Sequence, residues 1–154
     1  MSNLTDYKNI WVFIETECGK PKNVGYELLN VAKPLAETKG CELVAVVIGN
    51  NIENVAKDAI CYGADSAIIV DREEYEMYTT DAFAKALTAL VEKYKPETLM
   101  IGATNNGRDL GPRVSCRLKT GLTADCTGID IDEETGNVAW TRPTFGGRPS
   151  GLSK

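Results

Sequence analysis

Apolar and polar residues follow one another along the chain in a pattern that predicts strands alternating with helices. Four short runs are almost wholly apolar, as strands buried on both faces of a sheet are. They span residues 9–14, 43–48, 67–70 and 99–101. Between and after them, apolar residues recur every three or four positions, which is typical of helices with one buried face. These predicted helices span residues 24–36, 52–60, 83–94 and 110–118. Strands that alternate with helices indicate parallel βαβ units, so the expected fold class is α/β with a doubly wound, mostly parallel, Rossmann-like sheet.

Glycine, proline and short polar side chains predict where the helices begin and end. Gly40 and Gly63 are expected to end the first two helices, since glycine readily adopts the left-handed conformation of a helix C-terminus. Pro34 is expected to end or kink the first helix. Thr80 or Asp81 is expected to cap the third.

The alternation of strands and helices ends after residue 118. Two segments, 127–132 and 137–142, flank the polar segment 133–136 and predict a β-hairpin. The acidic segment 71–77 is expected to be an exposed connection.

The stretch 99–118 combines a short buried strand, a turn of small residues and a helix. The predicted turn, 103–107, has no side chain larger than asparagine, so a ligand or another backbone segment can approach it closely. Asp109 is expected to cap the helix, and Pro112 to lie in its first turn. A strand, a tight turn and a helix N-terminus together form the geometry that binds anions in α/β folds.

Known phosphate-binding motifs do not match this stretch. Gly102 and Gly107 have the glycine spacing of a P-loop, but Arg108 and Asp109 stand where that motif needs Lys and Ser or Thr. The dinucleotide fingerprint Gly-x-Gly-x-x-Gly is absent from the sequence. Two interpretations stay open: a ligand-binding turn, or a structural turn whose Arg108 and Asp109 pair with a neighbouring element.

Topology predicts where a site lies. In a doubly wound sheet with strand order 3-2-1-4, the order reverses between the first and fourth strands, and ligands bind outside the carboxyl ends of strands at such a point. The loops that follow these two strands are 15–23 and 103–107. The turn singled out by its local chemistry therefore lies where this topology places a site.

Charge limits the partners that the chain can have. The net charge is −5 and the isoelectric point about 4.8, which argues against non-specific binding to nucleic acid. No apolar run approaches the length of a membrane span, and the polar N-terminus has no signal core, so the expected location is the cytoplasm. Basic residues nevertheless cluster in one segment, as Arg108, Arg113, Arg117 and Lys119. They are interpreted either as a helix edge facing an acidic partner or as ordinary solvated side chains.

Cysteine and histidine usage limits the chemistry. The five cysteines form no Cys-x-x-Cys pair, as in chains whose cysteines are small buried side chains. Histidine is absent, which excludes nucleophile systems that use His as the base within this chain and makes a zinc site improbable. The chain is therefore not expected to be an enzyme by itself, and no metal site is expected.

Several separated motifs resemble one known family. Residues 102–114 are Gly-Ala-Thr-Asn-Asn-Gly-Arg-Asp-Leu-Gly-Pro-Arg-Val, and residues 120–127 are Thr-Gly-Leu-Thr-Ala-Asp-Cys-Thr. With Thr-Arg-Pro-Thr-Phe-Gly-Gly at 141–147 and the opening strand followed by Glu15, they closely resemble the alpha subunit of electron transfer flavoproteins. The similarity extends over residues 9–147.

The resemblance implies a domain organisation. Residues 1–147 would form the N-terminal α/β domain, which in that family is similar to adenine nucleotide alpha hydrolases. Residues 148–154 depart from the family pattern and are interpreted as an atypical tail, which looks like a truncation, an altered reading frame or a remnant of an expression vector. The C-terminal FAD-binding domain of the family is then absent from this sequence.

The resemblance also implies partners and cofactors. The alpha subunit would pair with a beta subunit in a heterodimer that carries electrons from dehydrogenases through FAD. FAD is expected in the full-length complex and not on this chain alone, while AMP or a second FAD is expected in the beta subunit. The chain would be a subunit of an electron carrier.

The leading hypothesis is therefore a scaffold and partner surface. Its candidate interface residues lie at the switch-point loop and the following helix start, and are Asn105, Asn106, Arg108, Asp109 and Arg113. Thr123, Asp125 and Thr127 are expected to be turn or cap residues at the same edge. The alternatives are a stand-alone module that binds AMP or ATP in the same crevice, and a structural fragment whose sheet is incomplete.

Overall fold

A four-stranded parallel sheet forms the centre of the protein. The computed structural model describes residues 6–124, 126 and 128–141. The sheet has the order β5-β4-β1-β6, with every neighbouring pair parallel. Its strands are β1 (Ile10–Ile14), β4 (Leu43–Gly49), β5 (Ser66–Asp71) and β6 (Thr98–Met100). The expected order, 3-2-1-4 among the four main strands, is confirmed.

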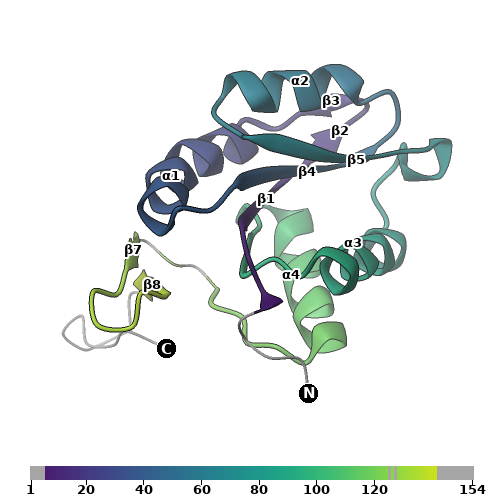
Figure 1. Ribbon diagram of the computed structural model, residues 1–154. Helices are drawn as coiled ribbons and strands as arrows, with labels where there is room; N and C mark the ends of the chain where they lie inside the picture. Colours follow the sequence, from purple (N-terminus) through teal and green to yellow (C-terminus); the bar gives the residue numbers. More distant parts are fainter. Residues whose placement is uncertain (1–5, 125, 127, 142–154) are drawn as a thin grey trace.

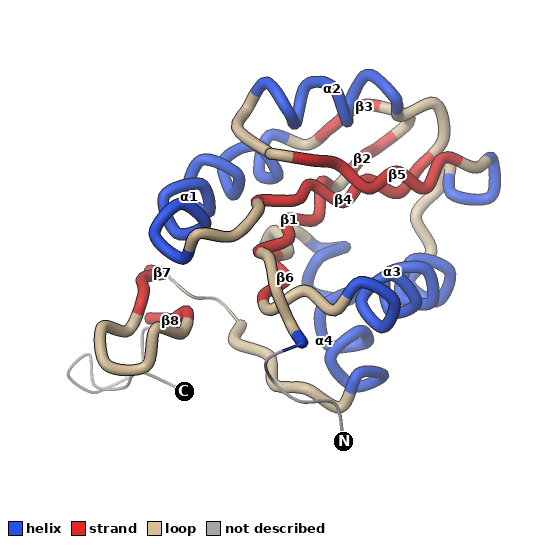
Figure 2. Tube along the Cα trace, viewed as in Figure 1, coloured by secondary structure: helices blue, strands red, loops and turns tan. Residues whose placement is uncertain are grey.

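Two helices cover each face of this sheet (Figures 1 and 2). Helices α1 (Asn23–Lys39) and α2 (Glu53–Cys61) pack on one face. Helices α3 (Thr80–Tyr94) and α4 (Asn105–Leu118) pack on the other, and a short 3-10 helix, η2 (Glu73–Tyr75), precedes α3. The doubly wound α/β class is therefore confirmed.

Strand β1 shows why the central strands are apolar throughout. Ile10, Val12 and Ile14 enter the core under α1 and α2. Trp11 and Phe13 enter the core under α3 and α4, where the ring of Phe13 meets that of Phe83 edge to face at 6.5 Å. All five residues of β1 are buried, because alternate side chains point into two different cores.

Two small antiparallel sheets lie outside the main one. Strands β2 (Thr16–Glu17) and β3 (Lys20–Pro21) form a tight hairpin within the predicted loop 15–23. Strands β7 (Gly128–Ile131) and β8 (Val138–Thr141) form the predicted C-terminal hairpin. Ile129, Ile131 and Trp140 from this hairpin pack against the core on the α1 side.

Helix ends agree with the sequence in part. Gly40 ends α1 in the left-handed conformation, as expected. Pro34 is expected to end or kink this helix, and the first alternative is wrong. Helix α1 continues to Lys39, because the next two residues, Leu35 and Ala36, are buried in the core and hold the last turn in place.

The start of α3 also differs from the prediction. Thr79 is its N-cap residue and makes no side-chain capping hydrogen bond. Thr80 and Asp81 lie within the helix, so the prediction that one of them caps it is wrong. Packing of the buried Phe83 and its neighbours fixes where this helix begins, not a cap.

One carboxylate ties the start of β4 to the turn before β5. Asp65 Oδ2 accepts the backbone N–H of Leu43 at 2.9 Å, and its Oδ1 accepts from Lys33 Nζ at 2.8 Å. These contacts, first the backbone hydrogen bond and then Lys33, hold the pKa of Asp65 below its usual value. None of the helices in the described part of the chain combines the length and apolar character needed to cross a membrane.

Candidate functional site

The carboxyl ends of β1 and β6 lie side by side, because these strands pair directly in the sheet. Each strand leads into a loop at that edge: Glu15 follows β1, and residues 101–104 follow β6 and lead into α4. This is the switch point of the sheet, where helices on opposite faces diverge.

Helix α4 begins earlier than the sequence suggests. Thr104 is its N-cap residue: its Oγ1 accepts the backbone N–H of Gly107 at 3.0 Å, and its carbonyl accepts the N–H of Arg108 at 2.9 Å. Asp109 therefore lies within the helix, and the prediction that it caps α4 is wrong. Pro112 lies inside the helix and not in its first turn.

The predicted turn 103–107 belongs mostly to the helix, which starts at Asn105. Two glycines allow this close approach of helix and strand. A Cβ on Gly107 would lie 1.9 Å from the carbonyl oxygen of Gly102. A Cβ on Gly102 would in turn meet both methyl groups of Val24 at 2.9 Å. The small residues thus serve contact between backbones and neighbouring side chains.

A buried carboxylate joins β1 to the start of α4. The Glu15 side chain accepts a short hydrogen bond from Thr104 Oγ1, and another from Asn106 Nδ2 at 3.0 Å. Lys22 Nζ lies 2.8 Å from the same carboxylate and forms an ion pair with it. Glu15 is only 5% exposed, so these three partners compensate for the burial of its charge.

Two further side chains around Glu15 carry shifted pKa values. The hydrogen bond to Glu15 raises the pKa of Lys22 above its usual value. Burial raises the pKa of Tyr78, and the charges of Asp109 and Glu15 act in the same direction. Tyr78 stays protonated and donates its hydroxyl to the carbonyl oxygen of Asn106 at 3.1 Å.

This arrangement differs from an anion site at a helix N-terminus. At such sites, a phosphate accepts hydrogen bonds from the N–H groups of the first turn. Here the N–H groups of Gly107 and Arg108 donate to Thr104, and Thr104 itself donates to Glu15. The carboxylate of Glu15 thus lies at the switch point and contacts the start of α4 through side chains, not through the N–H groups of its first turn.

The predicted interface residues lie in different surroundings in the structure. Asn106 joins the Glu15 cluster, whereas Asn105, Arg108 and Asp109 are exposed on α4. Arg113 Nη1 lies 3.3 Å from Asp81 Oδ1 on the neighbouring helix, and both side chains are mostly exposed.

Other expectations concern residues outside this cluster. Thr123 is half-buried, and Asp125 and Thr127 lie outside the described residues, as do most of the 141–147 motif and the tail 148–154. Sequence reasoning missed the roles of Glu15, Thr104, Lys22 and Tyr78. The available signal was a single acidic residue directly after a wholly apolar strand.

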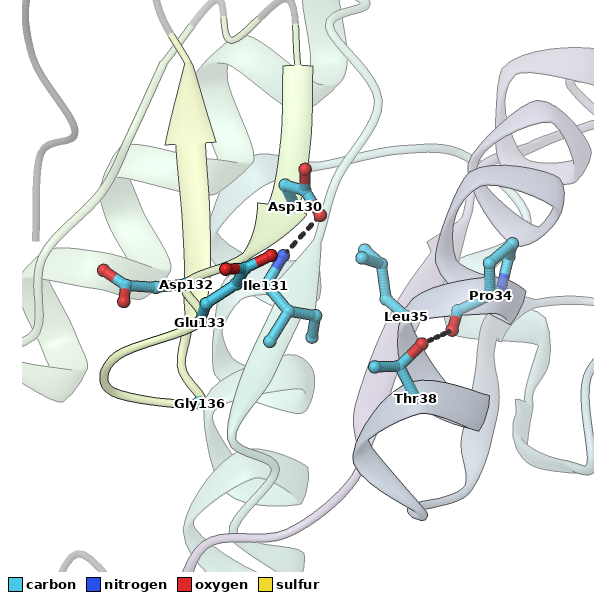
Figure 3. A pocket seen from close by; sticks show the side chains of 8 residues that line it. All are labelled: Pro34, Leu35, Thr38, Asp130, Ile131, Asp132, Glu133 and Gly136. Carbon is cyan, nitrogen blue, oxygen red and sulfur yellow. Dashed lines mark hydrogen bonds between the residues drawn. The ribbon is translucent and has the colours of Figure 1, made fainter.

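A groove lies away from the switch point, between the C-terminal half of α1 and the β7–β8 hairpin (Figure 3). It has a volume of about 470 Å³, and Leu35 and Ile131 form part of its opposite walls. Its hairpin side is acidic, with Asp130, Asp132 and Glu133. Within the described residues, no group of three or more Cys, Asp or Glu side chains is arranged to hold a metal ion.

The solved structures include one whose fold is similar to this one. A crystal structure titled as a universal stress protein in complex with cAMP aligns with a TM-score of 0.50 and 18% identity, over 77% of this chain and 95% of that one. At this identity the likeness concerns the fold alone.

Sequence comparisons give closer relatives. The chain is 52% identical over 144 residues to the electron transfer flavoprotein subunit alpha of Thermoanaerobacterium thermosaccharolyticum, and 50% identical over 145 residues to that of Clostridium acetobutylicum. Each match covers 94% of this chain and 43% of the relative. The acryloyl-CoA reductase electron transfer subunit beta of Anaerotignum propionicum is 43% identical over 169 residues, with 95% of this chain and 46% of that protein covered.

A family model supports the same assignment over nearly the whole chain. The model described as "Electron transfer flavoprotein domain" matches residues 10–149. This range contains the main sheet, its four helices and the Glu15 cluster. The chain belongs to the electron transfer flavoprotein domain family.

Proposed function

We propose that this chain acts as the N-terminal domain of an electron transfer flavoprotein alpha subunit, a scaffold that pairs with a beta subunit and does not itself hold the redox cofactor. Family membership and the alpha-subunit relatives support the assignment. The chain spans less than half the length of these relatives, so the activity of a whole subunit involves segments beyond it.

The observation that carries the scaffold role is the buried carboxylate at the switch point. A flavin or adenine nucleotide bound there would bring a phosphate to the start of α4. The Glu15 carboxylate lies beside that position, bonded to Thr104, Asn106 and Lys22, and its negative charge would repel a phosphate. The described residues at this crevice therefore do not fit FAD, AMP or ATP, which argues against a stand-alone nucleotide module.

The proposed cofactors and partners follow from the family. FAD belongs to the complete complex, and AMP or a second FAD to the beta subunit. The complex would receive electrons from dehydrogenases in the cytoplasm. One relative is named as an electron transfer subunit of acryloyl-CoA reductase, which supports a role in electron transfer. The proposed contacts to the beta subunit are Asn105, Asn106, Arg108, Asp109 and Arg113.

A visible absorption spectrum tests the proposal. The purified chain is mixed with excess FAD, passed through a desalting column and compared with the chain before addition. No retained flavin band is expected, while a tagged chain co-purifies with the beta subunit of its source organism. A stoichiometric flavin band on the chain alone would overturn the scaffold role.

The variant Arg108→Ala separates the scaffold from the nucleotide module. In a scaffold, this substitution weakens only assembly with the beta subunit. In a nucleotide module, it weakens binding of AMP or ATP by the isolated chain, which isothermal titration calorimetry measures.

A further inference from the structure

Positive charge gathers on the face of the protein covered by α3 and α4. Residues 80–120 contain seven lysines and arginines and four acidic residues, although the whole chain carries a net charge of −5. The basic residues are Lys85, Lys93, Lys95, Arg108, Arg113, Arg117 and Lys119. The remainder of the chain is correspondingly acidic, for example around η2, where residues 71–76 contain four acidic side chains and a single arginine. The charge is thus distributed with opposite signs on different parts of the surface.

The edge where α3 meets α4 concentrates this positive charge. Both helices pack on the same face of the sheet and contact each other. Tyr78, just before α3, bonds to Asn106 at the start of α4, and Asp81 in the first turn of α3 pairs with Arg113 in the middle of α4. The start of α3 therefore lies against the first half of α4.

One helical turn beyond Asp81 and Arg113 come Lys85 and Arg117, four residues further along each helix. Both are exposed, and neither has an ion pair with any residue in the part of the chain that the structure describes. Lys85 thus lies on the same side of α3 as Asp81, and Arg117 on the same side of α4 as Arg113. The acidic side chains on the outward surface of the two helices are Asp81, Glu92 and Asp109, of which Asp81 already pairs with Arg113.

The residue types suit a protein partner. The cations of α4 itself are all arginines, which bind carboxylates with two parallel hydrogen bonds, hold water weakly and are enriched at protein interfaces. A nucleic acid or an anionic membrane would be repelled by the net negative charge of the rest of the molecule. A protein surface with a local acidic patch meets the positive edge without approaching the acidic regions.

We propose that Lys85 and Arg117, together with Arg113, form a docking edge for an acidic surface of a protein partner. This rests on the proposed function, in which the partner is the beta subunit. It places the contact along the α3–α4 edge and adds two residues to the proposed interface.

Charge reversal tests this docking edge. The tagged chain is immobilised, and binding of the beta subunit from the same organism is followed at low and high salt. The variants are Lys85→Glu and Arg117→Glu. The control is Lys57→Glu on α2, on the opposite face, which changes the net charge equally and alters a side chain that is 68% exposed. Thermal melting by circular dichroism verifies that each variant is folded.

Each edge variant is expected to lower the association rate constant about tenfold at low salt and less at high salt, because rim charges act mainly by steering the encounter. The control is expected to bind like the wild type. Equal binding by all three variants and the wild type would overturn the docking edge and leave the proposed function in place. Absence of wild-type binding at every salt concentration would overturn the proposed function itself. Tighter, Arg117-dependent binding to phosphatidylglycerol vesicles or to DNA than to the beta subunit would refute a protein partner at this edge.

Discussion

Removal of the Glu15 carboxylate is expected to destabilise the protein by about 3 kcal/mol, because it leaves buried donors without an acceptor. A hydrogen bond to a charged group contributes roughly 1.5–3 kcal/mol, and Glu15 accepts two from partly buried partners, Thr104 and Asn106. The ion pair with Lys22 adds less, below about 1 kcal/mol, because the lysine side chain is 34% exposed and regains water when the pair is broken. The alanine variant of Glu15 therefore loses mainly the two hydrogen bonds to α4.

The glutamine variant separates charge from hydrogen bonding. Glu15→Gln keeps the shape of the side chain and one oxygen acceptor, and loses the charge that pairs with Lys22. Thr104 and Asn106 donate to different oxygens of Glu15, so the glutamine oxygen keeps only one of the two hydrogen bonds. We expect the variant to cost about 2 kcal/mol, less than Glu15→Ala. The difference between the two variants measures the hydrogen bond that glutamine retains.

Urea unfolding followed by circular dichroism measures both effects as a shift in midpoint at constant slope. The matched control is Glu17→Ala, since Glu17 lies 3.8 Å from the same lysine and its side chain is 75% exposed. It is expected to change the free energy of unfolding by less than about 0.5 kcal/mol. A Glu15→Ala variant as stable as the Glu17→Ala control would refute the role assigned to the buried carboxylate.

Three further predictions use other contacts in the same structure. Gly107→Ala is expected to destabilise the protein by about 3 kcal/mol or more, because its Cβ would overlap a carbonyl oxygen. Gly111→Ala, whose Cβ would have its nearest neighbour at 3.7 Å, should raise the melting temperature slightly. Equal melting temperatures of the two variants would contradict this expectation. Thr104→Ala should lower the free energy of unfolding in urea by about 1–2 kcal/mol, because the N-cap hydrogen bond is lost, and Asp109→Ala should lower it by less than about 0.5 kcal/mol. A larger loss in Asp109→Ala than in Thr104→Ala would indicate that Asp109 is the cap. The pKa of Asp65 is lowered in the folded state, so its contribution to stability is present above the ordinary pKa and is lost as the pH falls through the folded-state pKa. The stability of Asp65→Asn should therefore depend less on acid below about pH 4 than that of the wild type. An unchanged dependence of stability on pH would argue against this role of Asp65.

The sequence predicts the central fold well because its signals are strong and local. A strand buried on both faces has to be apolar at every position, and residues 10–14 and 43–48 meet this condition without exception. The order of the strands follows from the restricted topology of consecutive βαβ units. Gly40 marks its helix end because few other residues adopt the left-handed conformation found there.

The start of α4 shows what local sequence leaves undecided. Thr104 and Asp109 are both good N-cap residues, and Pro112 favours the later choice because proline is tolerated in a first turn. The earlier start gains the hydrogen bonds with Glu15, a residue 89 positions away from Thr104. Such a long-range contact has no periodic signal in the sequence.

The same reason explains why the cluster around Glu15 was not predicted as a unit. Its members come from the residue after β1, from the N-cap of α1, from the segment before α3 and from the start of α4. Each is an ordinary polar residue in its own segment. Only the pairing of β1 with β6 brings the carboxylate to the helix N-terminus.

The buried carboxylate links the closed crevice to the proposed docking edge. Glu15 fixes the first turn of α4 against β1, and Tyr78 fixes the same turn against the segment that enters α3. The first turn of α4 is therefore held by contacts to two other segments, and Arg113 and Arg117 follow it on the same helix. Loss of either contact is expected to shift the start of α4 and with it the side chains of the proposed docking edge.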